Sequence, residues 1–220
     1  MDSLLSKKGS AEYRTRSERS QWLSKRFEKY LRGSVLDVGC WNRDLEKVLP
    51  AGCDYLGIDV DGDPDQVVDL EKGELPFPNS SMDCVVCSDV LEHLENLHRM
   101  FDELVRVARF YVILSLPNTA GAAMKYVLTV GNSVMSKYGL PTDRPKDRHR
   151  WFFNYSEAVE FVNARAYKIG AKVIDEYAYG DEILNWRDRV KYILFPSAVR
   201  RRNLFAVAYW AVLDCQYKTI

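Results

Sequence analysis

Carboxylates recur at the ends of four short apolar segments in the first half of the chain. These acids and their neighbours are Asp37 before Gly39 and Cys40, Asp59 before Val60, Asp69 before Leu70, and Asp89 after Ser88. In a doubly wound sheet the carboxyl ends of the strands meet at one edge, and ligands bind there. An acid about 20 residues after a strand-ending glycine, as Asp59 is, can accept hydrogen bonds from both hydroxyls of a ribose. The pattern indicates a nucleoside site.

The acidity of this edge favours a cationic cofactor over ATP or a dinucleotide. Phosphate sites use Gly-rich amides together with Lys or Arg, and the sequence contains no GxxxxGK[ST] segment. S-adenosylmethionine carries a sulfonium, an ammonium and a ribose but no phosphate. We therefore expect S-adenosylmethionine as the cofactor and S-adenosylhomocysteine as the product.

Strands and helices alternate in the segment that must position these acids. The predicted strands lie at 34–39, 54–59, 66–70, 82–87 and 110–116, and the predicted helices at 42–49 and 95–108. Strands that are apolar throughout and alternate with helices form parallel sheets covered on both faces. The expected fold is α/β and doubly wound, and two closing strands at 171–179 and 203–213 make it a mostly parallel seven-stranded sheet.

Four segments make up the expected organisation. Residues 1–33 form a basic amphipathic helix that caps the domain, and residues 34–118 form the cofactor-binding core. Residues 119–170 are an acceptor-side insertion, with helices at 119–138 and at 156–167, the latter capped by Ser156. Residues 171–220 hold the closing strands, with a basic amphipathic stretch at 186–202 in the same domain.

The core resembles the class I S-adenosylmethionine-dependent methyltransferases, which have a Rossmann-like fold. VLDVGC at 35–40 resembles their first motif and GID at 57–59 their second. LPFPNSSMDCVVCSDVLEHL at 75–94 is similar to the family stretch LPFPDxSFDxVxxxxVLEHL, and the segment that follows, to residue 118, also resembles the family. The match is closest to the type 11 and MetW-like subgroup.

The resemblance implies a role for each acid. Asp37 would organise the methionine end with the backbone of Gly39 and Cys40, and Asp59 would hold the ribose. Asp69 and Leu70 would flank the adenine, and Ser88 and Asp89 would border the sulfonium and the methionine. Trp41 and Val60 would also contact the cofactor. Strand-end turn chemistry is the alternative explanation for Asp59 and Asp69.

One departure concerns the glycines of the first motif. The family pattern is D-x-G-C-G-x-G, whereas this chain has Trp41 and Arg43 at the second and third glycine positions. Those glycines let the backbone approach the cofactor closely. The Trp41 ring either clashes with the cofactor, turns aside or forms part of the pocket wall.

Methyl transfer needs an acceptor aligned with the methyl group and, for a hydroxyl acceptor, a general base. His149 is our first candidate base or acceptor ligand, because it follows the fifth strand and its flanking arginines favour the neutral imidazole. His93 is the second candidate, and His98 is expected on an exposed helix face. The five cysteines match no zinc or disulfide spacing, so we expect no metal site, and Cys84 and Cys87 are expected to be buried thiols on opposite faces of a strand.

The acceptor is a small molecule or a saccharide in this interpretation, methylated on oxygen by in-line transfer. Residues 33–118 carry a net charge of −11 between flanks of +5 and +6, so an anionic acceptor suits the basic flanks. Their basic residues include Arg144, Lys146, Arg148, Arg150, Arg187, Arg189, Lys191, Arg200, Arg201 and Arg202. Nucleic acid is a weaker candidate, because no RNA-binding module flanks the domain.

Two alternatives stay open at this point. Residues 186–202 mix aromatic and basic residues as membrane-surface helices do, although we favour a helix packed on its own sheet. The chain could also be a MetW-like accessory protein that keeps the cofactor fold and acts by binding a partner enzyme. The start of the sequence lacks the apolar core of a signal peptide, and we expect a cytoplasmic protein.

Overall fold

Seven strands form one sheet in the computed structural model, which describes residues 13, 15–129, 143, 148–183 and 185–218. The strands are β1 (Ser34–Val38), β2 (Asp54–Asp59), β3 (Gln66–Val67), β4 (Met82–Ser88), β5 (Ala108–Pro117), β6 (Lys172–Tyr179) and β7 (Ala208–Asp214). Their order is β3-β2-β1-β4-β5-β7-β6. Among these seven strands, β7 alone runs in the opposite direction, so its pairs with β5 and β6 are antiparallel and all other pairs are parallel. The predicted mostly parallel, seven-stranded, doubly wound fold is confirmed.

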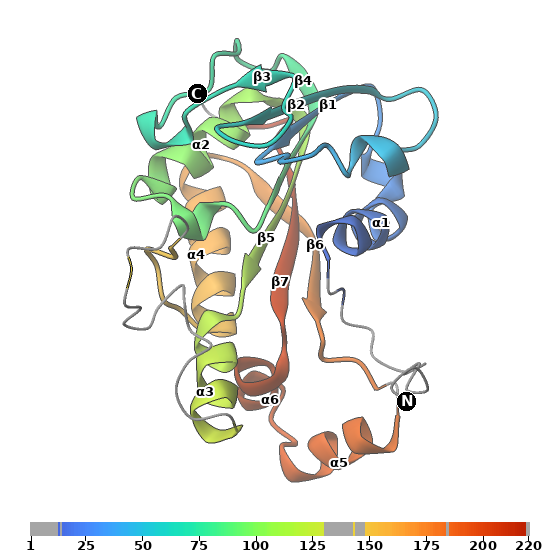
Figure 1. Ribbon diagram of the computed structural model, residues 1–220, viewed down its shortest axis with the longest axis vertical. Helices are drawn as coiled ribbons and strands as arrows, with labels where there is room; N and C mark the ends of the chain where they lie inside the picture. Colours follow the sequence, from blue (N-terminus) through green and yellow to red (C-terminus); the bar gives the residue numbers. More distant parts are fainter. Residues whose placement is uncertain (1–12, 14, 130–142, 144–147, 184, 219–220) are drawn as a thin grey trace.

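Helices cover both faces of this sheet (Figure 1). They are α1 (Arg16–Arg26), α2 (Leu97–Val107), α3 (Thr119–Thr129), α4 (Tyr155–Lys168), α5 (Trp186–Leu194) and α6 (Ala198–Phe205). Short 3-10 turns are η1 (Glu28–Tyr30), η2 (Glu46–Val48), η3 (Leu70–Lys72) and η4 (Leu91–His93). Side chains of α2 and α4 share one buried core, and those of α1 share the other with the opposite face of the sheet.

Alternating side chains divide the central strands between these two cores. In β4, Val85 and Cys87 belong to the α2 side, whereas Cys84 and Val86 belong to the α1 side. Because successive strand residues point to opposite faces, two residues three positions apart cannot pair. The expectation of buried, separate thiols at Cys84 and Cys87 is confirmed, and both are free.

The N-terminal helix α1 docks on β6 and β7 through aromatic side chains. Thr15 and Glu18 form a capping box at its first turn, which explains its start. Trp22 lies 5.2 Å from the Trp210 ring and 4.8 Å from the Tyr179 ring, centroid to centroid. These contacts fix α1 beside the carboxyl ends of the strands.

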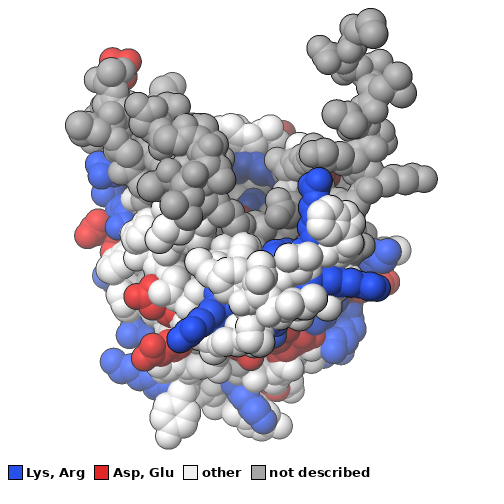
Figure 2. All heavy atoms as spheres, turned by 90° about the horizontal axis from the view of Figure 1, so that it is seen from below, with Lys and Arg blue, Asp and Glu red and all other residues white. Residues whose placement is uncertain are grey.

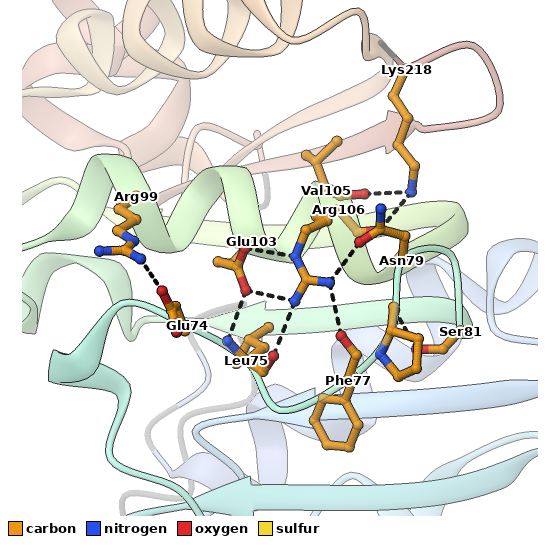
Figure 3. A network of polar contacts seen from close by, with 11 residues as sticks. Glu74, Leu75, Phe77, Asn79, Ser81, Arg99, Glu103, Val105, Arg106 and Lys218 are labelled. Atoms are coloured by element: carbon orange, nitrogen blue, oxygen red, sulfur yellow. Dashed lines mark hydrogen bonds and ion pairs between the residues drawn. The ribbon is translucent and has the colours of Figure 1, made fainter. Parts of the chain in front are cut away.

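Arg106 of α2 clamps the loop that leads into β4 (Figure 3). Its guanidinium donates to both oxygens of Glu103 at 2.7 Å, to the carbonyl of Phe77 at 2.8 Å and to that of Leu75 at 3.0 Å. Glu103 in turn accepts from the Leu75 amide at 2.8 Å. Burial alone would raise the pKa of the Glu103 carboxyl, but the hydrogen bonds from Arg106 and the Leu75 amide, together with the charges of Arg106 and Arg99, hold the pKa below its usual value.

Some predicted element boundaries are wrong, and each has a local cause. Residues 42–49 form turns and η2 rather than a helix, because Trp41 and Arg43 adopt left-handed backbone with φ of 51° and 54°. The predicted strand at 66–70 stops at Val67. Asn154, not Ser156, caps α4 through a capping box with Glu157.

The basic stretch at 186–202 was predicted to be one helix packed on the sheet. The structure corrects this prediction, because the stretch forms two helices, α5 and α6. Pro196 lacks an amide donor and restricts Phe195, so α5 ends at Leu194 and α6 starts after its cap, Ser197. Trp186 and Ile193 are 70% and 76% exposed. Among the described residues, no helix is both long enough and apolar enough to cross a membrane.

Candidate cofactor and acceptor site

A cavity of about 540 Å³ opens at the carboxyl ends of β1, β2 and β4. This is where the strand order reverses, the place at which doubly wound sheets bind ligands. Eight predicted cofactor residues line it, namely Gly39, Trp41, Asp59, Val60, Asp69, Leu70, Ser88 and Asp89. Asp61 and Glu71 add two further carboxylates, so the cavity is rich in acid and suits a cationic ligand.

Asp59 is fixed in position by backbone amides. Its Oδ2 accepts from the Trp41 amide at 2.8 Å, and its Oδ1 accepts from the Val60 amide at 2.7 Å and from the Asp61 amide at 3.3 Å. A carboxylate offers about four lone-pair sites, so these three bonds orient the group and leave capacity for a ligand hydroxyl.

The first-motif loop keeps the backbone shape of a glycine loop although two glycines are replaced. Gly39, Trp41 and Arg43 have φ of 81°, 51° and 54°. A Cβ on Gly39 would lie 2.3 Å from the Val90 side chain, so only glycine fits there. Non-glycine residues held in this region cost about 1–3 kcal/mol each, and such strain concentrates at functional sites.

The Trp41 ring forms part of the cavity wall. It is 38% exposed, and the guanidinium carbon of Arg16 lies 4.9 Å from its ring centroid. This cation–π contact holds the ring against α1. Among the three orientations that the sequence left open, the place of Trp41 in the cavity lining favours a ring that forms part of the pocket wall.

Asp37 and Cys40 lie behind the main cavity and do not line it. Together with Arg16 and Arg19 they border a small adjoining cavity of about 20 Å³. The Tyr55 hydroxyl donates to Asp37 Oδ2 at 2.9 Å, and burial raises the pKa of the Asp37 carboxyl to about 7. Burial also raises the pKa of the Cys40 thiol to about 12, so this thiol stays protonated at neutral pH.

Asp89 links the end of β4 to α1. Its Oδ2 accepts from Arg19 Nη1 at 2.5 Å, and its Oδ1 accepts from the Ser115 hydroxyl at 2.6 Å. The Ser115 hydroxyl also lies 3.1 Å from that of Ser88. Sequence reasoning missed Arg16 and Arg19 as site residues, because α1 was assigned only a capping role.

Asp69 and Leu70 stand at the far wall of the cavity. Asp69 accepts from the Glu71 amide at 3.1 Å and thereby caps η3, which is the turn role named as the alternative for this acid. Its neighbour Leu70 is buried and offers an apolar surface to the cavity. An exposed carboxylate beside an apolar wall fits the edge and face of a purine.

The two candidate catalytic histidines meet at the other end. His93 lines the cavity, and its ring centroid lies 4.4 Å from that of His149, edge to face. The buried carboxylate of Glu92 lies beside both, a neighbour that sequence reasoning missed. The Arg150 guanidinium pairs with Glu71 at 3.2 Å and with Glu95 at 3.7 Å. His98 is exposed, as expected, and contacts the rings of Trp151 and Phe161.

Solved methyltransferase structures share this fold. A SAM-dependent methyltransferase from Archaeoglobus fulgidus matches with a TM-score of 0.55 and 16% identity, over 92% of this chain and 96% of that chain. One from Mesorhizobium loti matches with a TM-score of 0.52 and 14% identity, over 89% and 97%. The small RNA methyltransferase HEN1 matches with a TM-score of 0.60 and 13% identity, over 97% of this chain and 27% of that chain.

The fold and the acid-lined cavity define a class I S-adenosylmethionine-dependent methyltransferase, with S-adenosylmethionine as its cofactor. A family model described as a methyltransferase domain matches residues 10–168, and the chain belongs to that family. No curated protein matches the chain in sequence. The MetW-like subgroup stays a prediction.

Proposed function

We propose that the chain transfers the methyl group of S-adenosylmethionine to a hydroxyl of a small-molecule or saccharide acceptor. The observation that carries this proposal is the polar end of the cavity, where His93 faces the cofactor space and His149 lies against it. A hydroxyl held in line with the sulfonium methyl needs a base within hydrogen-bond reach. Either imidazole can take up that proton.

The cofactor is placed by the residues at the strand ends. Asp59 binds the ribose hydroxyls, and Asp69 and Leu70 bind the adenine. Asp37, behind the main cavity, organises the methionine end from the small adjoining cavity that it borders with Gly39 and Cys40. Trp41 and Val60 form the walls, and Ser88 and Asp89 border the sulfonium. Arg16 lines both cavities, so its guanidinium is placed to meet the cofactor carboxylate.

The acceptor side is formed by the segments around His149 and by α5 and α6. Helix α3 follows the carboxyl end of β5, and α6 precedes the start of β7, which pairs with that end of β5 (Figure 1). Arg144 and Lys146 lie outside the described residues. Arg201 is buried against Asp181, with bonds of 2.8 and 3.3 Å, and Arg202 pairs with the same carboxylate.

The exposed surface of α5 and α6 favours an anionic acceptor that carries a lipid. Figure 2 shows basic side chains around a largely uncharged surface at this end of the molecule. Arg187, Arg189 and Arg200 are exposed there, next to Trp186 and Ile193. Such a mixture binds anionic lipid surfaces. Co-sedimentation with phosphatidylglycerol vesicles, but not with phosphatidylcholine vesicles, is the expected result.

Release of S-adenosylhomocysteine in the presence of acceptor panels tests the proposal. We expect turnover with acidic or lipid-linked sugars, and at least a tenfold loss of turnover in His149→Ala with cofactor affinity unchanged. His98→Ala is the matched control and should turn over like the wild type. Cofactor binding without turnover on any acceptor, together with a stable protein partner, would instead favour the accessory function.

A further inference from the structure

Two imidazoles and one carboxylate converge at the acceptor end of the cavity. Glu92, His93 and His149 each offer one ligand atom, and these three atoms lie within 4.8 Å of one another. His93 Nε2 lies 3.6 Å from Glu92 Oε1, and His149 Nε2 lies 4.0 Å from the same oxygen. We propose that this cluster binds a first-row divalent metal ion such as Zn²⁺.

The donor set matches that chemistry. Two imidazole nitrogens and one carboxylate oxygen form the three protein ligands of many catalytic zinc sites, and the same set binds other first-row ions. With bonds of about 2.0–2.1 Å, tetrahedral ligand atoms lie about 3.3 Å apart. The 3.6 and 4.0 Å separations approach that value, and small rotations of the imidazole rings bring both nitrogens inward.

Burial strengthens the case for a cation. The side chains of Glu92, His149 and His93 are 1%, 8% and 24% exposed. Little water reaches these three side chains, so water competes weakly with them for a bound cation. His93 also lines the cofactor cavity, so the open side of the cluster faces the space where the acceptor would lie.

The backbone holds the two ligand-bearing segments together without an ion. The Arg150 amide donates to the Glu92 carbonyl at 2.8 Å, and Trp151 Nε1 donates to the Leu94 carbonyl at 2.7 Å. Arg150 Nε adds a bond of 3.1 Å to the His93 carbonyl. Ligand side chains can therefore be changed one at a time while these contacts keep the segments in place.

The role of the ion in transfer rests on the proposed function, whereas its binding does not. A divalent ion lowers the pKa of a hydroxyl that it binds, so the acceptor hydroxyl would release its proton to water and its oxygen would attack the sulfonium methyl, with S-adenosylhomocysteine as the leaving group. With the ion bound, His93 and His149 would hold it, and the base role proposed above would apply to the chain without metal. We expected no metal site from the residue spacing, because Glu92 and His149 are far apart along the chain.

Titration of the EDTA-treated full-length chain with Zn²⁺ and Co²⁺ tests the site. We expect one ion per chain by calorimetry, and visible Co²⁺ absorption bands typical of nitrogen and oxygen ligands. Glu92→Gln, His93→Ala and His149→Ala should each weaken binding at least tenfold. His98→Ala should bind like the wild type, because His98 lies outside the cluster.

Absence of stoichiometric binding by the wild type would overturn the proposal, as would an equal loss in His98→Ala or unchanged affinity in all three ligand variants. Thermal unfolding of each variant shows whether it is folded. His93 is the most exposed of the three ligands, so His93→Ala still tests the site if a substitution at Glu92 or His149 unfolds the chain. S-adenosylhomocysteine affinity is measured in EDTA, so failure of the metal site and failure of the cofactor site give different results.

Discussion

Three amides hold the Asp59 carboxylate at the end of β2, and the proposed ribose contact would depend on that group. Asp59→Ala should weaken S-adenosylhomocysteine binding about 10- to 100-fold, equivalent to about 1.5–3 kcal/mol for a lost charged hydrogen bond. Calorimetric titration measures the change. Asp54→Ala, an exposed position at the opposite end of β2, is the control. Equal affinity of Asp59→Ala and wild type would contradict the ribose placement.

Asp37 makes stability depend on pH. Its pKa is about 7 in the folded chain because of burial, above the usual 3.8, so between pH 4 and 7 the folded state holds a proton that the unfolded state has lost. The contribution of Asp37 to the free energy of unfolding therefore falls as pH rises, by up to about 1.4 kcal/mol per unit. Urea unfolding at pH 5 and pH 7 should show this fall in the wild type and a smaller one in Asp37→Asn. Equal slopes in both would contradict the assignment.

At the scale of the elements, the Arg106 clamp joins α2 to the loop before β4 (Figure 3). Arg106→Ala removes five hydrogen bonds and leaves the half-buried Glu103 carboxylate without its guanidinium. We expect a loss of about 2–3 kcal/mol in the free energy of unfolding, measured by urea titration. Arg99→Ala breaks only the exposed pair with Glu74 and should cost under about 0.5 kcal/mol. Similar losses of unfolding free energy in Arg106→Ala and Arg99→Ala would show that the Arg106 hydrogen bonds do not stabilise the fold.

The ion pair between Arg19 and Asp89 should control how firmly α1 covers the cofactor cavity. Its side chains are 17% and 20% exposed, so removal of Arg19 leaves a poorly solvated carboxylate. Arg19→Ala should speed amide hydrogen exchange in α1 about tenfold and weaken cofactor binding. Lys25→Ala, at an exposed position of the same helix, should change neither. Unaltered amide hydrogen exchange in Arg19→Ala would mean that the aromatic contacts of α1 hold the helix in place without the ion pair.

Sequence reasoning succeeded where chemistry follows local pattern. Strand periodicity and strand-end acids located the sheet and its binding edge, because side-chain alternation and parallel pairing are set by nearby residues. It failed at 42–49, where the left-handed backbone at Trp41 and Arg43 overrides helix propensity. It also failed to join Glu92 to His149, since that contact depends on the path of a distant segment over η4.

At the scale of the whole molecule, one sheet carries cavity-lining residues at the ends of β1, β2 and β4, and the helices of the proposed acceptor side follow β5 and β6 (Figure 1). The charge distribution follows the same division, with acid at the cofactor cavity and base on α5 and α6. A cationic cofactor would meet the acidic cavity, and an anionic acceptor would meet the basic surface of α5 and α6.

The most direct test of this account is calorimetric titration of the wild type with S-adenosylmethionine and S-adenosylhomocysteine, in EDTA. The account predicts micromolar binding of one molecule per chain, with Trp41 and Arg43 in place. No binding at millimolar concentration would contradict it, because the loop at 39–43 would then keep the glycine backbone shape without admitting the cofactor.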